Sequence, residues 1–173
     1  MILTGTEIIR NFHLGKIKID PFNESRATTN SYDLKLGNRF IIYKSKIIDP
    51  KQKPEYELIK ASRRGILLNK GQFILGETKE KLGSDHFVPI VHAKSGVARM
   101  GLFVHVTADI IDIGSYGNST LQLYATLPVK LYPDMDIAQV SFWVPKGKIT
   151  LYEGKYQHSD GPQASKIWMS MKK

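Results

Sequence analysis

The amino-acid sequence predicts an all-β fold. Short runs that alternate apolar and polar residues recur throughout the chain, and the segments between them are rich in Gly, Pro and Asn. Alternation with a period of two is typical of half-buried strands, and these three residue types are typical of turns. Only one stretch has a helical pattern. We therefore expect a barrel or sandwich of short strands in one domain, for which 173 residues are sufficient.

The helical stretch covers about residues 5–13. Thr4 and Glu7 have the T-x-x-E spacing of a capping box, and the apolar residues that follow lie on one face of a helix. Gly15 is expected to end it. A short amphipathic helix should therefore cover one side of the sheet core.

The first strands follow this helix. Pro21 ends the first of them, which suggests an edge position, and Tyr32, Leu34 and Leu36 alternate with polar residues in the second. Turn residues separate the remaining runs, and residues 23–30 and 47–56 are expected to be loops. In the first half of the chain, strands are predicted at residues 16–22, 31–36, 39–44, 66–68, 72–75 and 87–91.

Two local predictions concern the middle of the chain. Asn69-Lys70-Gly71 is a good turn sequence, so residues 66–68 and 72–75 should pair as a hairpin. Residues 77–82 are charged and predict a helical turn or a loop.

The second half of the chain continues the pattern. Gly114 and Gly117 flank a predicted hairpin turn, and residues 154–163 are polar, which predicts a mobile tail. Strands are expected at residues 103–107, 119–124, 128–131, 137–144 and 149–152.

Residues 93–124 hold the clearest candidate site. Lys94, Ser95, Gly96 and Arg99 supply cations, a hydroxyl and accessible backbone N–H groups, which are the parts of an anion cradle. Asp112 directly follows two isoleucines, at the predicted edge of the core. Each of these residues alone has a simpler interpretation, as a surface charge or a turn aspartate. Their combination favours a binding pocket.

The motifs around this stretch resemble those of the trimeric dUTPase and dCTP deaminase superfamily, in its dCTP deaminase-like branch. Five segments match in the family's order and cover nearly the whole chain. They are Ser31-Tyr32-Asp33-Leu34, Ala93 to Leu102, Ile111-Asp112 with Gly117, Asp136 to Val140, and Gly154 to Ile167.

The resemblance implies a distorted jelly roll that forms a homotrimer with active sites shared between subunits. It implies a β domain over residues 1–153 and a tail, residues 154–173, that could close over a bound triphosphate as a lid. The catalytic positions it implies are Asp112 and Gln122. The substrate-binding positions are Asp33, Lys94, Ser95, Gly96, Arg99, Thr107, Ala108, Gln139, Lys155, Tyr156, Gln163 and Lys166.

One departure from the family decides the expected reaction. The deaminases have a glutamate five residues after the motif-three glycine, where this chain has Gln122. An amide can orient a water molecule but cannot take its proton. Asp112 is retained, so the resemblance implies hydrolysis of dUTP to dUMP and diphosphate with Asp112 as general base. Two further departures are Gly96, in place of a serine, and Ser115, in place of an aromatic residue. The neighbouring Tyr116 could compensate for the missing aromatic ring.

Two alternatives remain open. One is dCTP deamination, which would need another base to replace the missing glutamate. The other is a nucleotide-binding protein whose catalytic site has decayed. For either enzyme the resemblance implies a pyrimidine deoxynucleoside triphosphate as substrate. It also implies Mg²⁺ carried by the phosphates, with Asp33 contacting the ion at most through water.

Composition excludes several other classes. There is no cysteine, hence no disulfide and no cysteine-based zinc site, and the five histidines have no metal-ligand spacing. His105, in an alternating run, is expected to be a structural residue. The net charge of +9 is dispersed, which favours a triphosphate over nucleic acid. The first residues resemble no signal peptide and no apolar stretch could span a membrane, so we expect a cytoplasmic protein.

Overall fold

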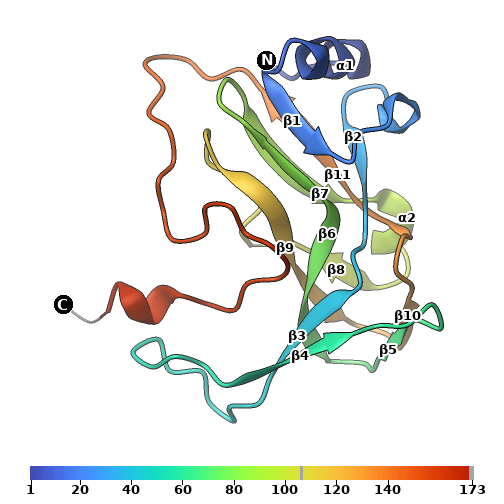
Figure 1. Ribbon diagram of the computed structural model, residues 1–173. Helices are drawn as coiled ribbons and strands as arrows, with labels where there is room; N and C mark the ends of the chain where they lie inside the picture. The colour runs from blue at the N-terminus through green and yellow to red at the C-terminus, as the bar shows by residue number, and fades with distance from the viewer. Residues whose placement is uncertain (106, 172–173) are drawn as a thin grey trace.

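The computed structural model describes residues 1–105 and 107–171, and it confirms the all-β prediction (Figure 1). Antiparallel strands in three sheets make up most of the fold, and one nine-residue helix lies at the amino-terminal end. The strands are β1 (Ile17–Asp20), β2 (Tyr32–Lys35), β3 (Arg39–Tyr43), β4 (Tyr56–Lys60), β5 (Ile66–Leu68), β6 (Phe73–Ser84), β7 (Val88–Ala93), β8 (Leu102–Val104), β9 (Tyr116–Ala125), β10 (Val129–Leu131) and β11 (Asp136–Trp143). The helical segments are α1 (Gly5–His13), α2 (Ser95–Ala98) and the 3₁₀ turns η1 (Glu24–Arg26) and η2 (Ile167–Met169).

The largest sheet is built around β6 and β9. Its strand order is β4-β3-β6-β9-β8, and β1 also pairs with β6. β6 and β9 are antiparallel, with Leu75 opposite Gln122 and Leu82 opposite Gly117. The register shifts between Glu77 and Lys81, so that β6 carries a bulge at its middle. This pair of long strands places the motif-three residues on a rigid support.

A three-stranded sheet, in the order β2-β11-β7, carries other motif residues. In its register Gln139 of β11 lies opposite Asp33 of β2 on one side and His92 of β7 on the other. The chain leaves β7 directly into Lys94 and α2. The first, second and fourth family motifs therefore meet in one sheet.

The core lies between these sheets and beneath α1. Tyr32, Phe40 and Phe142 are its largest fully buried side chains, and Ile8 attaches the helix to it. α1 has the predicted bounds, and Gly15 follows it with a φ of 69°. The predicted capping box is absent, because the side chain of the N-cap residue Thr4 makes no capping hydrogen bond and its hydroxyl contacts that of Thr6 instead. The apolar face, rather than the cap, therefore holds the helix in place.

The prediction of a helical turn or loop at residues 77–82 is wrong, since they form the middle of β6. Glu77 and Glu80 are almost fully buried there. Arg39 binds Glu77 through three nitrogen–oxygen contacts of 2.9–3.0 Å, and the Lys35 N–H donates to Glu80 at 2.9 Å. Partners from distant parts of the chain thus make buried acids tolerable in a central strand.

Two further predictions about the strands are also wrong, one about pairing and one about the existence of a strand. β5 pairs with β10 rather than with β6. The predicted turn between β5 and β6 does form, since the Gln72 N–H donates to the Asn69 carbonyl. Residues 149–152 are not a strand; the Tyr152 N–H donates to the Ile113 carbonyl across an irregular loop. The strand predicted at 103–107 corresponds to β8, which ends at Val104, and Val106 lies outside the described residues.

The described part of the tail is packed along β9. It runs down beside that strand and ends below it, on the side of β3 and β4 (orange to red in Figure 1). Backbone hydrogen bonds join Asn118 to Ser159 and His158 to Tyr116, each at 2.9 Å. Gly117 makes this close approach feasible, because a Cβ there would lie 2.6 Å from the Ser159 nitrogen. Among the described residues, no helix is both long and apolar enough to cross a membrane.

Candidate active site

The anion cradle predicted from the sequence is assembled around Asp33 and Lys94. The Lys94 ammonium group donates to Asp33 Oδ2, and the side chains are 28% and 15% exposed. The Ser31 hydroxyl donates to Gln139 Oε1 at 3.2 Å, which orients that amide beside them. Asp33 Oδ1 is buried and has no hydrogen-bond partner among the described residues. This oxygen is free to accept a hydrogen bond from a ligand or its water.

The other cradle residues lie on α2 at the surface. Ser95, Gly96 and Arg99 are exposed, whereas Val97 between them is buried and anchors the turn. A Cβ at Gly96 would meet nothing within 4 Å, so no contact within the chain explains this glycine. The cradle therefore presents a hydroxyl and a guanidinium outward.

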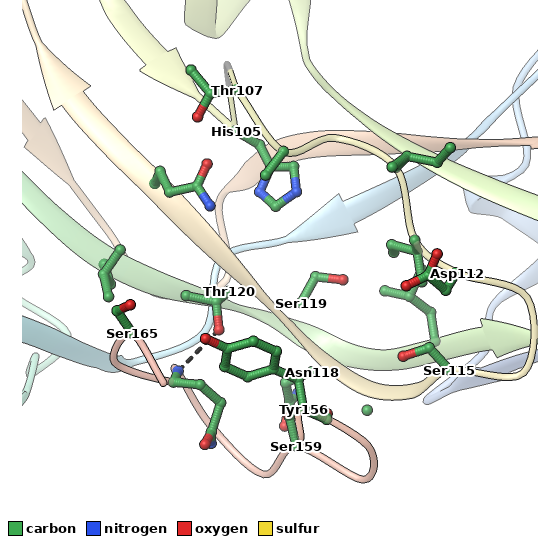
Figure 2. A pocket seen from close by; sticks show the side chains of 18 of the residues that line it. His105, Thr107, Asp112, Ser115, Asn118, Ser119, Thr120, Tyr156, Ser159 and Ser165 are labelled. Atoms are coloured by element: carbon green, nitrogen blue, oxygen red, sulfur yellow. Dashed lines mark hydrogen bonds between the residues drawn. The ribbon is translucent and has the colours of Figure 1, made fainter. Parts of the chain in front are cut away.

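The main pocket lies elsewhere, along β9 and the loop that precedes it. It has a volume of about 550 Å³, large enough for a nucleotide. Figure 2 shows His105 and Thr107 at one end and Asp112 and Ser115 at the other, with Tyr156 across from them.

The structure thus sorts the predicted site residues into separate groups. The pocket is lined by Thr107, Ala108, Asp112, Gln122, Tyr156 and Gln163. Asp33, Lys94, Ser95, Gly96, Arg99 and Gln139 do not line it, and neither do Lys155 and Lys166. Within one chain the motif-three residues and the anion cradle do not form a common site.

Asp112 stands at the exposed end of the pocket. The Ile111 N–H donates to the Pro89 carbonyl at 2.9 Å, and the Asp112 carbonyl accepts from the Ser115 N–H at 3.0 Å. These backbone bonds fix the loop and leave the carboxylate in solvent. Ser115 and its neighbour Tyr116 both line the same end. An exposed carboxylate held by its backbone can activate a water molecule.

Gln122 and His105 meet at the opposite end. The His105 N–H donates to the Gln122 carbonyl at 3.2 Å, and both side chains line the pocket. Gln122 Oε1 and His105 Nδ1 are buried, and neither has a hydrogen-bond partner within the described chain. Burying an unpartnered polar atom is costly, so two of them at a pocket wall indicate that a ligand or water binds there.

His105 is the functional candidate that sequence reasoning missed. The side chain is buried, as the alternating run predicted. Its backbone, however, is left-handed, with a φ of 59°, and its ring faces the pocket (Figure 2). Burial lowers the pKa of the imidazole, although Ala108, Thr120 and Asp109 act in the opposite direction. The alternating pattern contained no signal of this turn.

The tail closes one side of the pocket. Tyr156 OH accepts from the Lys166 N–H at 2.8 Å, and the Gln163 N–H donates to the Thr120 hydroxyl at 2.9 Å. Lys155 and Lys166 flank the Tyr156 ring, with ammonium–centroid distances of 5.9 and 5.2 Å. In this arrangement the two lysines support Tyr156 and leave the pocket wall to it and Gln163.

No group of three or more His, Asp or Glu residues that could hold a metal ion occurs within residues 1–105 and 107–171. A magnesium ion carried by a triphosphate needs no such group, because phosphate oxygens and water supply most of its ligands.

Comparisons with known proteins agree on one family. Residues 2–144 match the family model described as dCTP deaminase-like. The "dCTP deaminase, dUMP-forming" of Clostridium beijerinckii is 38% identical, that of Clostridium botulinum (strain Eklund 17B) 39% and that of Cytophaga hutchinsonii 37%. Each of these alignments covers 100% of both chains.

A solved structure shows the same fold. The 2'-deoxycytidine 5'-triphosphate deaminase from Agrobacterium tumefaciens superposes with a TM-score of 0.65 and 20% identity. The match covers 83% of this chain and 48% of that one. It confirms the dUTPase-like β fold expected from the motifs.

These comparisons correct the expected reaction. Gln122 led us to expect a dUTP diphosphatase in place of a deaminase, but full-length relatives at 37–39% identity are named as dUMP-forming dCTP deaminases. The expectation of a dUTP diphosphatase is therefore wrong, and the deaminase alternative is the better supported one. The identity of residue 122 alone was too narrow a basis for choosing between reactions of one family.

Proposed function

Because this chain belongs to the dCTP deaminase-like family, we propose that it is an enzyme that converts dCTP to dUMP, with release of ammonia and diphosphate. The observation that carries the proposal is the buried acceptor Gln122 Oε1 in the pocket wall, which has no partner among the described residues. The 4-amino group of cytosine is a hydrogen-bond donor, and uracil has a carbonyl oxygen in its place. Buried acceptors that await a donor therefore favour cytosine.

The two ends of the pocket suit the two chemical steps of this conversion. We assign the buried end, with Gln122, to the cytosine base. Asp112, at the exposed end, would take a proton from the water that attacks the α-phosphorus. The main chain around Thr107 and Ala108, which line the pocket, would contribute to base selection.

The active site is proposed to be shared between subunits of a homotrimer. A triphosphate bound in the pocket of one chain finds Asp112 and Gln122 there, but not Lys94, Ser95 or Arg99 of the same chain. The exposed cradle on α2 is available to a neighbouring subunit. Assembly would supply the missing cations.

The residues present fit magnesium that arrives with the substrate. Asp33 Oδ1 is buried and without a partner within the described residues, so it can accept from a water molecule of such an ion. When bound, the ion would neutralise charge on the phosphates. Lys94, paired with Asp33 Oδ2, holds that carboxylate in its orientation.

The direct test is incubation of the purified chain with dCTP and magnesium, with ion-exchange chromatography of the nucleotides and an assay for ammonia. We expect dUMP and ammonia in equal amounts. Binding of dCTP without its consumption would refute the enzyme proposal and identify a nucleotide-binding protein instead. Consumption of dUTP alone would refute the choice of base.

Subunit sharing predicts that two inactive variants complement each other. Arg99→Ala removes the guanidinium of the cradle, and Asp112→Asn removes the proposed base at the exposed end of the pocket. Each variant alone should therefore form little dUMP. After mixed refolding, about a quarter of the sites in a randomly mixed trimer should hold both intact halves and recover dUMP formation. If both halves of a site came from one chain, the mixture would stay inactive.

A further inference from the structure

His105 has been given no catalytic role so far, yet its position suits one. Its imidazole is 8% exposed, lines the pocket and points into it above Ser119 and Thr120 (Figure 2). Nδ1 is buried without a hydrogen-bond partner among the residues described. The backbone bond from His105 to Gln122 places it beside the one side chain that the deaminase motif would make catalytic.

We propose that His105 Nδ1 is the base that activates water for attack on C4 of cytosine, taking over the task that Gln122 cannot perform. This inference rests on the proposed dCTP deamination. The chemistry at residue 122 requires such a partner, since an amide accepts hydrogen bonds but does not take up a proton at neutral pH. Gln122 Oε1 is then left to hold the water or the amino group in place.

The other titratable groups of the pocket are less suitable. Asp112 lies at the opposite, exposed end (Figure 2). The remaining ones are tyrosines, which are protonated at neutral pH and cannot act as bases. These are Tyr43, Tyr116, Tyr152 and Tyr156. His105 alone, among the described pocket residues, combines a basic lone pair with burial beside Gln122.

The electrostatic surroundings keep this lone pair available. Burial lowers the pKa of His105 from its ordinary value of 6.5, and the carboxylate of Asp109 and the backbone of Ala108 and Thr120 only partly offset the effect. The imidazole is therefore neutral at pH 7 and ready to accept a proton. Once protonated in the closed pocket, it is a strong enough acid to return the proton.

The step balances without any further reagent. The oxygen of water bonds to C4, and its proton passes through Nδ1 to N3 of the ring. Nδ1 then takes the remaining proton of the new hydroxyl and delivers it to the amino group. The C4–N bond breaks, ammonia leaves, and a C4 carbonyl with a protonated N3, which is uracil, remains. The step needs no oxidant and no reductant.

The test compares three variants for binding and turnover of dCTP. His105→Asn keeps a residue that tolerates the left-handed backbone but removes the base. We expect kcat for ammonia release to fall roughly 100-fold to 10,000-fold, with dCTP binding within about threefold of the parent. His158→Asn is the matched control, because His158 is exposed, has a φ of 56° and does not line the pocket, and it should keep the parent kcat.

The third variant separates a catalytic role from a structural one. His105→Asn combined with Gln122→Glu restores a base at the neighbouring position, so it should regain at least about tenfold in kcat over His105→Asn. In the parent, kcat should fall on the acid side with an apparent pKa below the ordinary 6.5 of histidine.

Two outcomes would overturn the proposal, and they can be told apart. Ammonia release by His105→Asn at the parent rate would remove His105 from catalysis while dCTP deamination stands. No ammonia release by the parent chain, with dCTP bound, would refute the deaminase function itself and with it the role of His105.

Discussion

Asp112→Asn is expected to change the product of dCTP from dUMP to dUTP. Asparagine keeps the size and the backbone bonds of the loop but removes the basic oxygen from the exposed end of the pocket. Loss of a general base slows a step roughly 100-fold to 10,000-fold. Because His105, the proposed base for deamination, lies at the other end (Figure 2), ammonia release should continue while dUMP formation falls by that factor.

The measurement is a time course in which ammonia, dUTP and dUMP are quantified together. Asp49→Asn serves as the control, because Asp49 lies in an exposed loop and does not line the pocket. It should leave the product unchanged. Unaltered dUMP formation by Asp112→Asn would show that another group attacks the phosphate, and loss of both products would show that the two ends are not independent.

Arg39→Met is expected to destabilise the fold by about 3–5 kcal/mol, the usual cost of leaving one partner of a buried ion pair uncompensated. Glu77 is 3% exposed in the middle of β6, and both of its oxygens accept from Arg39 Nε at 3.0 Å. The same contact raises the pKa of Arg39, as expected for a cation held by a buried carboxylate. Urea unfolding at a fixed protein concentration would measure the loss.

The control exploits the second partner of Arg39. Asp160 lies 3.2 Å from the guanidinium, but its side chain is 68% exposed, so Asp160→Asn should barely change the urea midpoint. Combining Arg39→Met with Glu77→Leu removes both charges and should recover much of the stability. An equal loss in Asp160→Asn and Arg39→Met would place the stabilising contact at the tail instead of in β6.

The accuracy of the strand predictions depended on whether the decisive contacts were local. β2 was predictable because Tyr32, Leu34 and Leu36 alternate, and all three are fully buried. The central part of β6 was not, because Glu77 and Glu80 look like solvent-exposed residues until Arg39 and other remote partners are known. β4 was missed because most of its side chains are exposed and show no buried alternation.

The candidate site shows the same difference between features set by local sequence and features set by remote contacts. The order of the motifs was sufficient to select Asp33, Lys94 and Gln139, and the register of β2, β11 and β7 brings them together. The separation of this group from the pocket follows from sheet topology, which no local pattern encodes. His105 escaped notice because its function depends on a left-handed turn beside β9 and on an atom left without a partner.

The way the tail is held has an evolutionary consequence. Three of its attachments use its own backbone N–H groups: Gly161 donates to Asn118 Oδ1, Gln163 to the Thr120 hydroxyl and Ser165 to Tyr43 OH. These donors belong to the main chain and do not depend on the side chains of the donating residues, whereas the accepting groups are specific side chains. Proline is the exception, since it lacks the donor. Homologues should therefore avoid proline at positions 161, 163 and 165.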